Sequence, residues 1–172
     1  MSPAPFKITR KFSAFILAAT MCSSCITEDM PESKEYIGIG DNLPFFELTT
    51  DDGHQLNTDS LRGKRSMIVF FNTDCADCRQ ELPIIDRVAA RCSGDVTTIC
   101  ISREEGATEV AEYWRANGLT LPYSAQTDRS IFNLFASSGI PRIYISDAGL
   151  RVTAIFSDRD MPAEEQLLDA LH

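Results

Sequence analysis

The 172-residue sequence has few of the residues that bind metals or nucleic acid. It contains two histidines, His54 and His172, and a single Cys-x-x-Cys motif after the N-terminal 25 residues. A structural zinc site needs about four ligands, so we expect neither a metal nor another cofactor. Basic residues are also scarce, since 16 lysines and arginines stand against 25 aspartates and glutamates, for a formal charge of −9. An acidic surface repels phosphate backbones, which argues against a nucleic-acid partner.

Long apolar runs are missing too. The run at 12–19 is too short to cross a bilayer, which takes roughly 20 apolar residues. It follows three basic residues, Lys7, Arg10 and Lys11, and precedes a stretch of small residues. This order is typical of a secretory signal, so we predict a signal peptide over residues 1–24.

Two cysteines, Cys22 and Cys25, lie at the end of this segment. The stretch 21–25 resembles the lipobox of bacterial lipoproteins, in which a cysteine becomes the lipidated first residue of the mature chain. Cys25 fits that position better because the small Ser24 precedes it. We therefore expect an exported protein that is lipid-anchored in the periplasm or outer membrane, with residues 25–40 as a polar tether. A plain cleaved signal with two incidental cysteines is the alternative.

The 148 residues after the signal are enough for one ordinary domain, which we assign to 41–172. They hold 13 basic and 25 acidic residues, a formal charge of −12. Strand and helix patterns alternate along them, which predicts an α/β fold with parallel pairings and helices on both faces of the sheet. The predicted strands are 45–50, 55–56, 67–71, 96–101, 121–125, 143–146 and 150–156, and the predicted helices are 78–91, 108–117, 128–136 and 162–171.

The Cys-x-x-Cys motif, Cys75 and Cys78, follows a buried strand and opens a helical pattern. Cys75 should therefore lie at or near a helix N-terminus, where unpaired N–H groups and the helix dipole stabilise a thiolate. A thiolate with a second thiol within one turn is the working part of a disulfide exchanger. The alternative is a structural bridge, which would close so short a ring that it would stabilise the fold only modestly.

Three features in register resemble the thioredoxin superfamily. They are the strand–Cys-x-x-Cys–helix unit, Pro83 five residues after the second cysteine, and the segment 138–141 before a strand. Within the superfamily the sequence is similar to exported thiol-disulfide oxidoreductases of the TlpA/ResA type, whose N-terminal hairpin and connector match residues 42–71. The resemblance implies a thioredoxin-like fold, with a mixed central sheet flanked by helices and an added N-terminal β-hairpin.

The same resemblance implies a thiol-disulfide oxidoreductase and a role for each matching residue. Cys75 would be the exposed nucleophile and Cys78 the buried resolving thiol, and together they would form the redox disulfide. Pro141 would be a cis proline that faces the pair, and the backbone of Ile140 would pair with a bound substrate strand. The implied partners are client proteins with disulfides, an upstream membrane thiol reductant and the membrane, reached through the lipid anchor on Cys25.

The sequence departs from the family pattern around the thiols. Asp74 stands where tryptophan is usual, and Asp77 lies between the cysteines. Like charge disfavours a thiolate, so we expect a reducing couple rather than a strong oxidant. No buried acid that would assist the second thiol stands out. Cys92 and Cys100 are expected to be free apolar side chains, and a bridge between them is the alternative.

Two other functions fit the same residues. A peroxiredoxin-like thiol peroxidase shares the general fold, but that family has threonine where Asn72 stands and proline where Ile68 stands, and Thr73 lies one residue late. A non-enzymatic surface lipoprotein would use the thioredoxin-like domain only for binding. Disulfide reduction that depends on Cys75 separates the exchanger from the binding protein, and peroxide consumption identifies the peroxidase.

Overall fold

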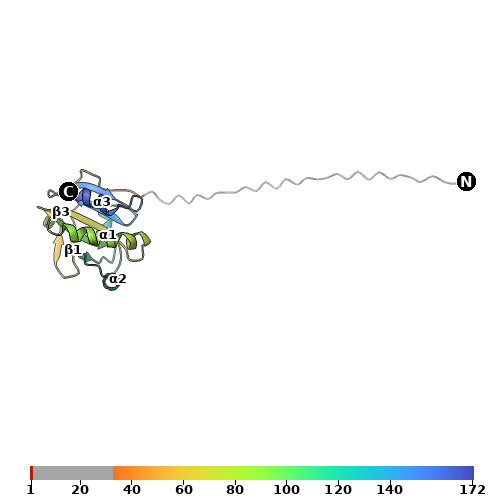
Figure 1. Ribbon diagram of the computed structural model, residues 1–172, viewed down its shortest axis with the longest axis horizontal. Helices are drawn as coiled ribbons and strands as arrows, with labels where there is room; N and C mark the ends of the chain where they lie inside the picture. Colours follow the sequence, from red (N-terminus) through yellow and green to blue (C-terminus); the bar gives the residue numbers. More distant parts are fainter. Residues whose placement is uncertain (2–32) are drawn as a thin grey trace. The chain divides into compact units, whose positions relative to one another are not determined.

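The structure is a computed structural model that describes Met1 and residues 33–172 (Figure 1). The predicted signal peptide, the proposed lipid-attachment residue Cys25 and the first part of the predicted tether lie outside the described residues. Within the part that is described, no helix has the length and apolar character that a membrane crossing requires.

A five-stranded mixed sheet forms the centre of the domain, in the order β5-β4-β3-β6-β7. The strands β3 (Arg65–Phe71), β4 (Val96–Ser102) and β5 (Tyr123–Ser124) are parallel, whereas β6 (Arg142–Ser146) and β7 (Val152–Phe156) pair antiparallel. The last five residues of β3 are fully buried, as expected for a central strand that is covered on both faces. The predicted mixed sheet is confirmed.

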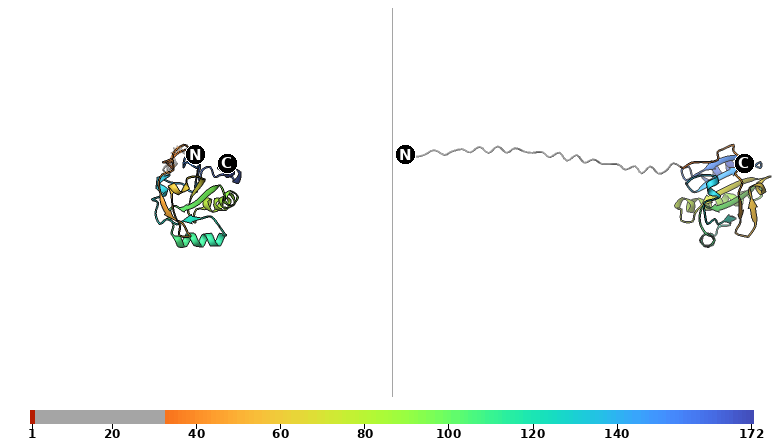
Figure 2. Two further views of the ribbon diagram at one scale, coloured as in Figure 1. Left: turned by 90° about the vertical axis from the view of Figure 1, so that its left-hand side faces the viewer. Right: turned by 180° about the vertical axis from the view of Figure 1, so that it is seen from behind.

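Three α-helices and an N-terminal hairpin surround the sheet. The helices are α1 (Ala76–Cys92), α2 (Ala107–Asn117) and α3 (Glu164–Leu171), and the hairpin consists of β1 (Glu47–Thr49) and β2 (Gln55–Asn57). A short 3₁₀ helix, η1 (Thr58–Leu61), connects the hairpin to the central strand. The helices α2 and α3 lie on opposite sides of the domain (Figures 1 and 2). The added hairpin and the flanking helices agree with the fold class that the sequence predicts.

The two neighbouring phenylalanines at the end of β3 pack on opposite faces of the sheet, because successive side chains of a strand alternate. Phe71 packs against Trp114 of α2, with ring centroids 4.8 Å apart. Phe70 packs edge-on against three aromatic rings that close the other face. Its ring centroid lies 5.3 Å from Phe132, 4.9 Å from Phe135 and 6.1 Å from Tyr144.

The predicted helix over 128–136 is wrong, because this segment forms only a short 3₁₀ turn, η2 (Phe132–Leu134). Its local backbone hydrogen bonds form only this turn, and the backbone at its C-terminal end also pairs with a distant part of the chain. The N–H of Tyr36 donates to the carbonyl of Phe135 at 2.9 Å, and the N–H of Ser137 donates to the carbonyl of Lys34 at 2.9 Å. A nonlocal pairing has therefore replaced the helix that the local pattern favours.

These hydrogen bonds also show that the domain includes residues before the predicted boundary at 41. Residues 33–40, which the sequence assigns to the tether, lie against the domain. Besides the bonds near η2, the N–H of Gly40 donates to the carbonyl of Val152 at 2.8 Å. The last part of the predicted tether is thus bonded to the domain, which extends to at least residue 33.

The aromatic cluster around Phe70 should dominate the stability of its face of the core. We expect Phe70→Ala to lower the free energy of unfolding by about 3–5 kcal/mol, because it removes a fully buried ring and leaves a cavity. Phe45→Ala is the matched control, since that ring is 60% exposed and its loss should cost less than about 0.5 kcal/mol. Urea unfolding followed by circular dichroism measures both, and similar losses in the two variants would contradict the packing described.

Candidate active site

Cys75 is the N-cap of α1, at the point where the chain turns back from the end of β3. Its backbone is extended (φ −77°, ψ 121°), and its Sγ accepts a hydrogen bond from the N–H of Cys78 at 3.3 Å. Cys75 is partly buried and Cys78 is fully buried. An N–H aimed at the first sulfur, together with the helix dipole, stabilises negative charge on it. The placement of Cys75 at a helix N-terminus is as the sequence predicts.

The turn before Cys75 is held by two side chains, Glu105 from the loop between β4 and α2 and Arg79 from α1. The N–H of Thr73 donates to a carboxylate oxygen of Glu105 at 2.8 Å, and the Thr73 hydroxyl donates to the other oxygen. From α1, Arg79 donates to the carbonyl of Thr73 and forms a 3.3 Å ion pair with Asp74. The Arg79 guanidinium therefore offsets part of the negative charge that Asp74 brings to the thiols.

The loop that precedes β6 faces Cys75. Its Ile140–Pro141 peptide bond is cis, which confirms the conformation predicted from the sequence. The Sγ of Cys75 donates to the carbonyl of Ile140 at 3.4 Å. The two segments, 65 positions apart in the sequence, border an open cavity of about 310 Å³. This cavity is lined by Asn72, Asp74, Cys75, Arg103 and Ile140.

Cys78 and a buried acid lie on one face of α1. Burial raises the pKa of the Cys78 thiol, and its hydrogen bond with Cys75 acts in the same direction. Glu81 follows three residues later, which puts both side chains on the same side of the helix. Glu81 is 1% exposed, its Oε1 has no hydrogen-bond partner in the structure, and burial raises the pKa of Glu81 to about 7.

The sequence analysis missed Glu81, although a signal for it was present. The apolar stripe of this helix contains Leu82, Ile85 and Val88, and Glu81 lies next to it at helical spacing from Cys78. A carboxylate in the buried stripe of a helix that begins at a thiol pair is a candidate proton carrier.

The remaining cysteines and histidines lie apart from this pair. Cys92 at the end of α1 and Cys100 in β4 are both free thiols. His54 pairs with Asp52 at 2.8 Å in the turn of the N-terminal hairpin, and His172 is the C-terminal residue. Within residues 33–172, the structure shows no cluster of three or more side chains that could hold a metal.

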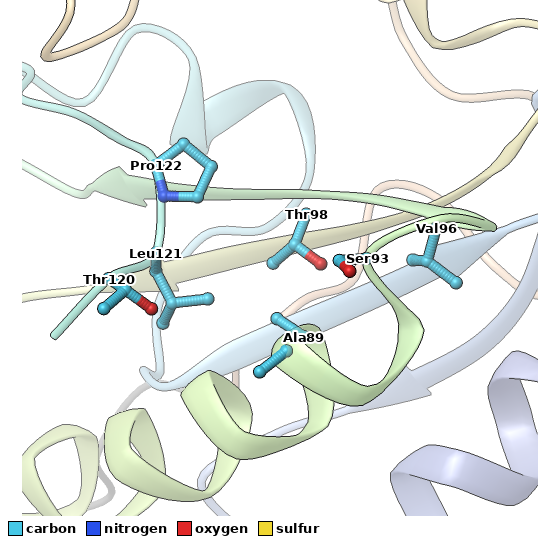
Figure 3. Close-up of a pocket in the computed structure, with 8 residues that line it drawn as sticks. Ala89, Ser93, Val96, Thr98, Thr120, Leu121 and Pro122 are labelled. Carbon is cyan, nitrogen blue, oxygen red and sulfur yellow. The ribbon is translucent and has the colours of Figure 1, made fainter.

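A second cavity, of about 240 Å³, lies between the C-terminal end of α1 and the start of β4 (Figure 3). A 17-residue helix is about 25 Å long, so this cavity is far from Cys75 at the other end of α1. Its described lining is apolar or hydroxyl-bearing and offers no ionisable group for catalysis. The lining residues are Ala89, Ala90, Ser93, Val96, Thr98, Thr120, Leu121 and Pro122.

Several known proteins resemble this chain. The thiol-disulfide oxidoreductase ResA of Bacillus subtilis (strain 168) is 25% identical over 113 residues, which are 65% of this chain and 63% of ResA. The crystal structure of a thio-disulfide isomerase from Thermus thermophilus has a TM-score of 0.65 and 28% identity, covering 78% of this chain and 95% of that one. A solution structure from Bacteroides thetaiotaomicron has a TM-score of 0.72 and 26% identity, with coverages of 80% and 92%.

These similarities confirm the thioredoxin-like fold and the resemblance to proteins of the ResA type. The chain spans a little under two thirds of the length of ResA, and almost the whole length of the two solved structures. Residues 39–160, which include the cysteine pair and the cis proline, match the AhpC/TSA family, so the chain belongs to that family.

Proposed function

We propose that the protein is a thiol-disulfide oxidoreductase that reduces disulfides of client proteins through Cys75 and Cys78. The observation that carries this proposal is the geometry of Cys75, whose sulfur accepts the N–H of Cys78 and lies beside the carbonyl of Ile140 in an open cavity. The similarity to the thiol-disulfide oxidoreductase ResA and to a thio-disulfide isomerase supports the same chemistry.

The reaction proceeds in two exchange steps. The Cys75 thiolate attacks one sulfur of the client disulfide, whose S–S bond breaks, so that one client thiolate leaves and a mixed disulfide forms. Cys78 then gives up its proton and attacks the Cys75 sulfur, which releases the second client thiolate. The client gains two electrons and the pair becomes a disulfide, which an upstream membrane thiol reductant must reduce before the next cycle.

Glu81 is the proposed acceptor of the Cys78 proton. Cys78 is fully buried and its pKa is raised, so it needs a nearby base before it can attack. A carboxyl with a pKa of about 7 exchanges protons near neutral pH, and the free Oε1 of Glu81 has a lone pair available for this.

The loop with Ile140 and Pro141 is the proposed client-binding element. It borders the cavity beside Cys75, and the backbone next to a cis proline lies within hydrogen-bonding distance of the nucleophile. An extended client segment bound there would hold its disulfide against Cys75. Binding through backbone groups places few demands on client sequence.

The proposed location is the cell envelope, with the chain exported by the signal at 1–24 and anchored through a lipid on Cys25. The basic segment, short apolar run and small residues before Cys25 support this assignment. The thioredoxin-like domain at 41–172, extended by 33–40, would then be held near the membrane that carries its reductant.

Removing either thiol should separate the two exchange steps. We expect Cys75→Ser to lower the rate of insulin disulfide reduction to background, and Cys78→Ser to accumulate a mixed disulfide between Cys75 and the client. Cys92→Ser is the matched control and should keep full activity, since that thiol lies at the other end of α1. Turbidity and non-reducing gels with mass spectrometry give the readouts. Equal activity in the parent and Cys75→Ser would refute the exchanger, and rapid peroxide consumption that survives Cys78→Ser would favour a peroxidase.

The buried carboxyl predicts a pH-dependent stability. The pKa of Glu81 is higher in the folded chain (about 7) than its ordinary value of 4.5, so the folded state binds the proton more tightly. The contribution of Glu81 to stability is therefore greatest at low pH and is lost as pH rises through 7, by about 2–3 kcal/mol between pH 5 and pH 8. Glu81→Gln should remove this component, so that parent and variant diverge between the two pH values in urea unfolding under reducing conditions. A difference that is the same at both would contradict the assignment.

The anchor has its own test. Mass spectrometry of the mature protein purified from its native membranes should find an N-terminal diacylglyceryl cysteine at position 25, and Cys25→Ala should move the protein into the soluble envelope fraction. Cys22→Ala is the control and should leave the protein in the membrane. An unmodified N-terminus downstream of Cys25 would remove the anchor from the account.

A further inference from the structure

A buried arginine follows the cis proline directly and closes the loop that faces Cys75. Arg142 is only 2% exposed. Its Nε donates to the carbonyls of Ser138 at 3.0 Å and Gly139 at 3.1 Å, and its Nη2 donates to the Ser138 carbonyl at 2.7 Å. The loop 138–141 is therefore wrapped around the guanidinium of the residue that follows it.

The loop fits this guanidinium closely. Gly139 has a φ of +84°, a conformation that favours glycine. A Cβ at this position would lie 2.7 Å from a carboxylate oxygen of Asp158 and 3.0 Å from Nη2 of Arg142. The position of the loop backbone is thus tied to the position of the Arg142 side chain.

The charge of Arg142 is balanced from the N-terminal side of the domain. Its guanidinium forms an ion pair with Glu35, 107 positions earlier in the chain. The other Glu35 oxygen accepts a hydrogen bond from the Tyr144 hydroxyl at 2.7 Å. Burial raises the pKa of Tyr144 to about 12, so this hydroxyl remains a donor at neutral pH. A buried guanidinium without its carboxylate would be strongly destabilised where it is, so Glu35 keeps Arg142 in the loop.

The backbone around Glu35 is fastened to the same loop. The Ser33 hydroxyl donates to the carbonyl of Ser138 at 2.6 Å and also accepts from Arg142. The N–H of Lys34 donates to the Ser137 hydroxyl at 2.8 Å. The segment 33–35 therefore contacts the loop, its preceding residue Ser137 and the Arg142 side chain.

We propose that Glu35 and Arg142 are positioning residues for the client-binding loop: their ion pair holds Ile140 and Pro141 in place beside Cys75. Neither residue touches the reacting sulfurs, and both act through the loop. This inference rests on the proposed function, because it assigns a role in client binding. It also means that the chain leading from the predicted anchor ends in a segment that supports the active-site loop.

The test compares two ion-paired carboxylates of similar exposure, one with a buried arginine partner and one with exposed arginine partners. Glu35→Gln removes the carboxylate at the loop, and Glu164→Gln removes one that pairs with Arg87 and Arg91 between α1 and α3. The Glu35 and Glu164 side chains are 37% and 31% exposed. Each variant and the parent is assayed with insulin, which needs the loop, and with a small aryl disulfide, which needs only a reactive Cys75.

Glu35→Gln should raise the KM for insulin at least fivefold, with kcat and the rate with the aryl disulfide unchanged within twofold. Glu164→Gln should leave all three unchanged. An unchanged KM in Glu35→Gln would overturn the proposal. A similar fall in the reduction rates of insulin and of the aryl disulfide would also overturn it, since that pattern indicates a general structural defect.

A readout that is independent of activity distinguishes this inference from the proposed function. Amide hydrogen exchange of the reduced proteins should be at least tenfold faster at 138–142 in Glu35→Gln than in the parent or Glu164→Gln. Unchanged protection there would overturn the positioning role even in an active enzyme. A parent that reduces neither substrate would refute the proposed function instead, and the exchange measurement would still decide whether Glu35 holds the loop.

Discussion

The site depends on one change of direction, where β3 ends and α1 begins. The last five residues of the strand are fully buried and its position in the sheet is fixed by neighbours on both sides, so the turn after it has little freedom. Cys75 occupies the N-cap and receives the Cys78 N–H, while Glu105 and Arg79 hold the turn at Thr73. The reactivity proposed for Cys75 follows from this backbone geometry.

The sequence predicts the features that depend on local residue pattern, namely the central strand and the start of the helix at Cys75. The apolar run at 67–71 indicated a central strand, and the cysteine spacing placed Cys75 at a helix start. The family resemblance supplied the cis bond at Pro141, which composition alone would not have indicated. Residues 128–136 show the limit of local pattern, because they form only a short turn and the backbone at their C-terminal end pairs with 34–36. No helical periodicity contains information about such a distant partner.

The candidate site likewise combines features that local sequence pattern can predict with features that depend on distant contacts. Glu81 was within reach of sequence reasoning, since it follows Cys78 at helical spacing. The ion pair between Glu35 and Arg142 was not, because it joins residues 107 positions apart, one of which the composition assigned to a polar tether. The three-dimensional structure changes the meaning of that segment, from a spacer to a part of the domain that contacts the active-site loop.

The central claim is that the fold makes Cys75, and not Cys78, the reacting sulfur. Alkylation of the reduced protein with iodoacetamide at pH 7, followed by peptide mass spectrometry over time, tests it most directly. The account predicts rapid modification of Cys75 with Cys78 protected until the protein is unfolded. An inert Cys75, or modification of Cys78 first, would contradict it.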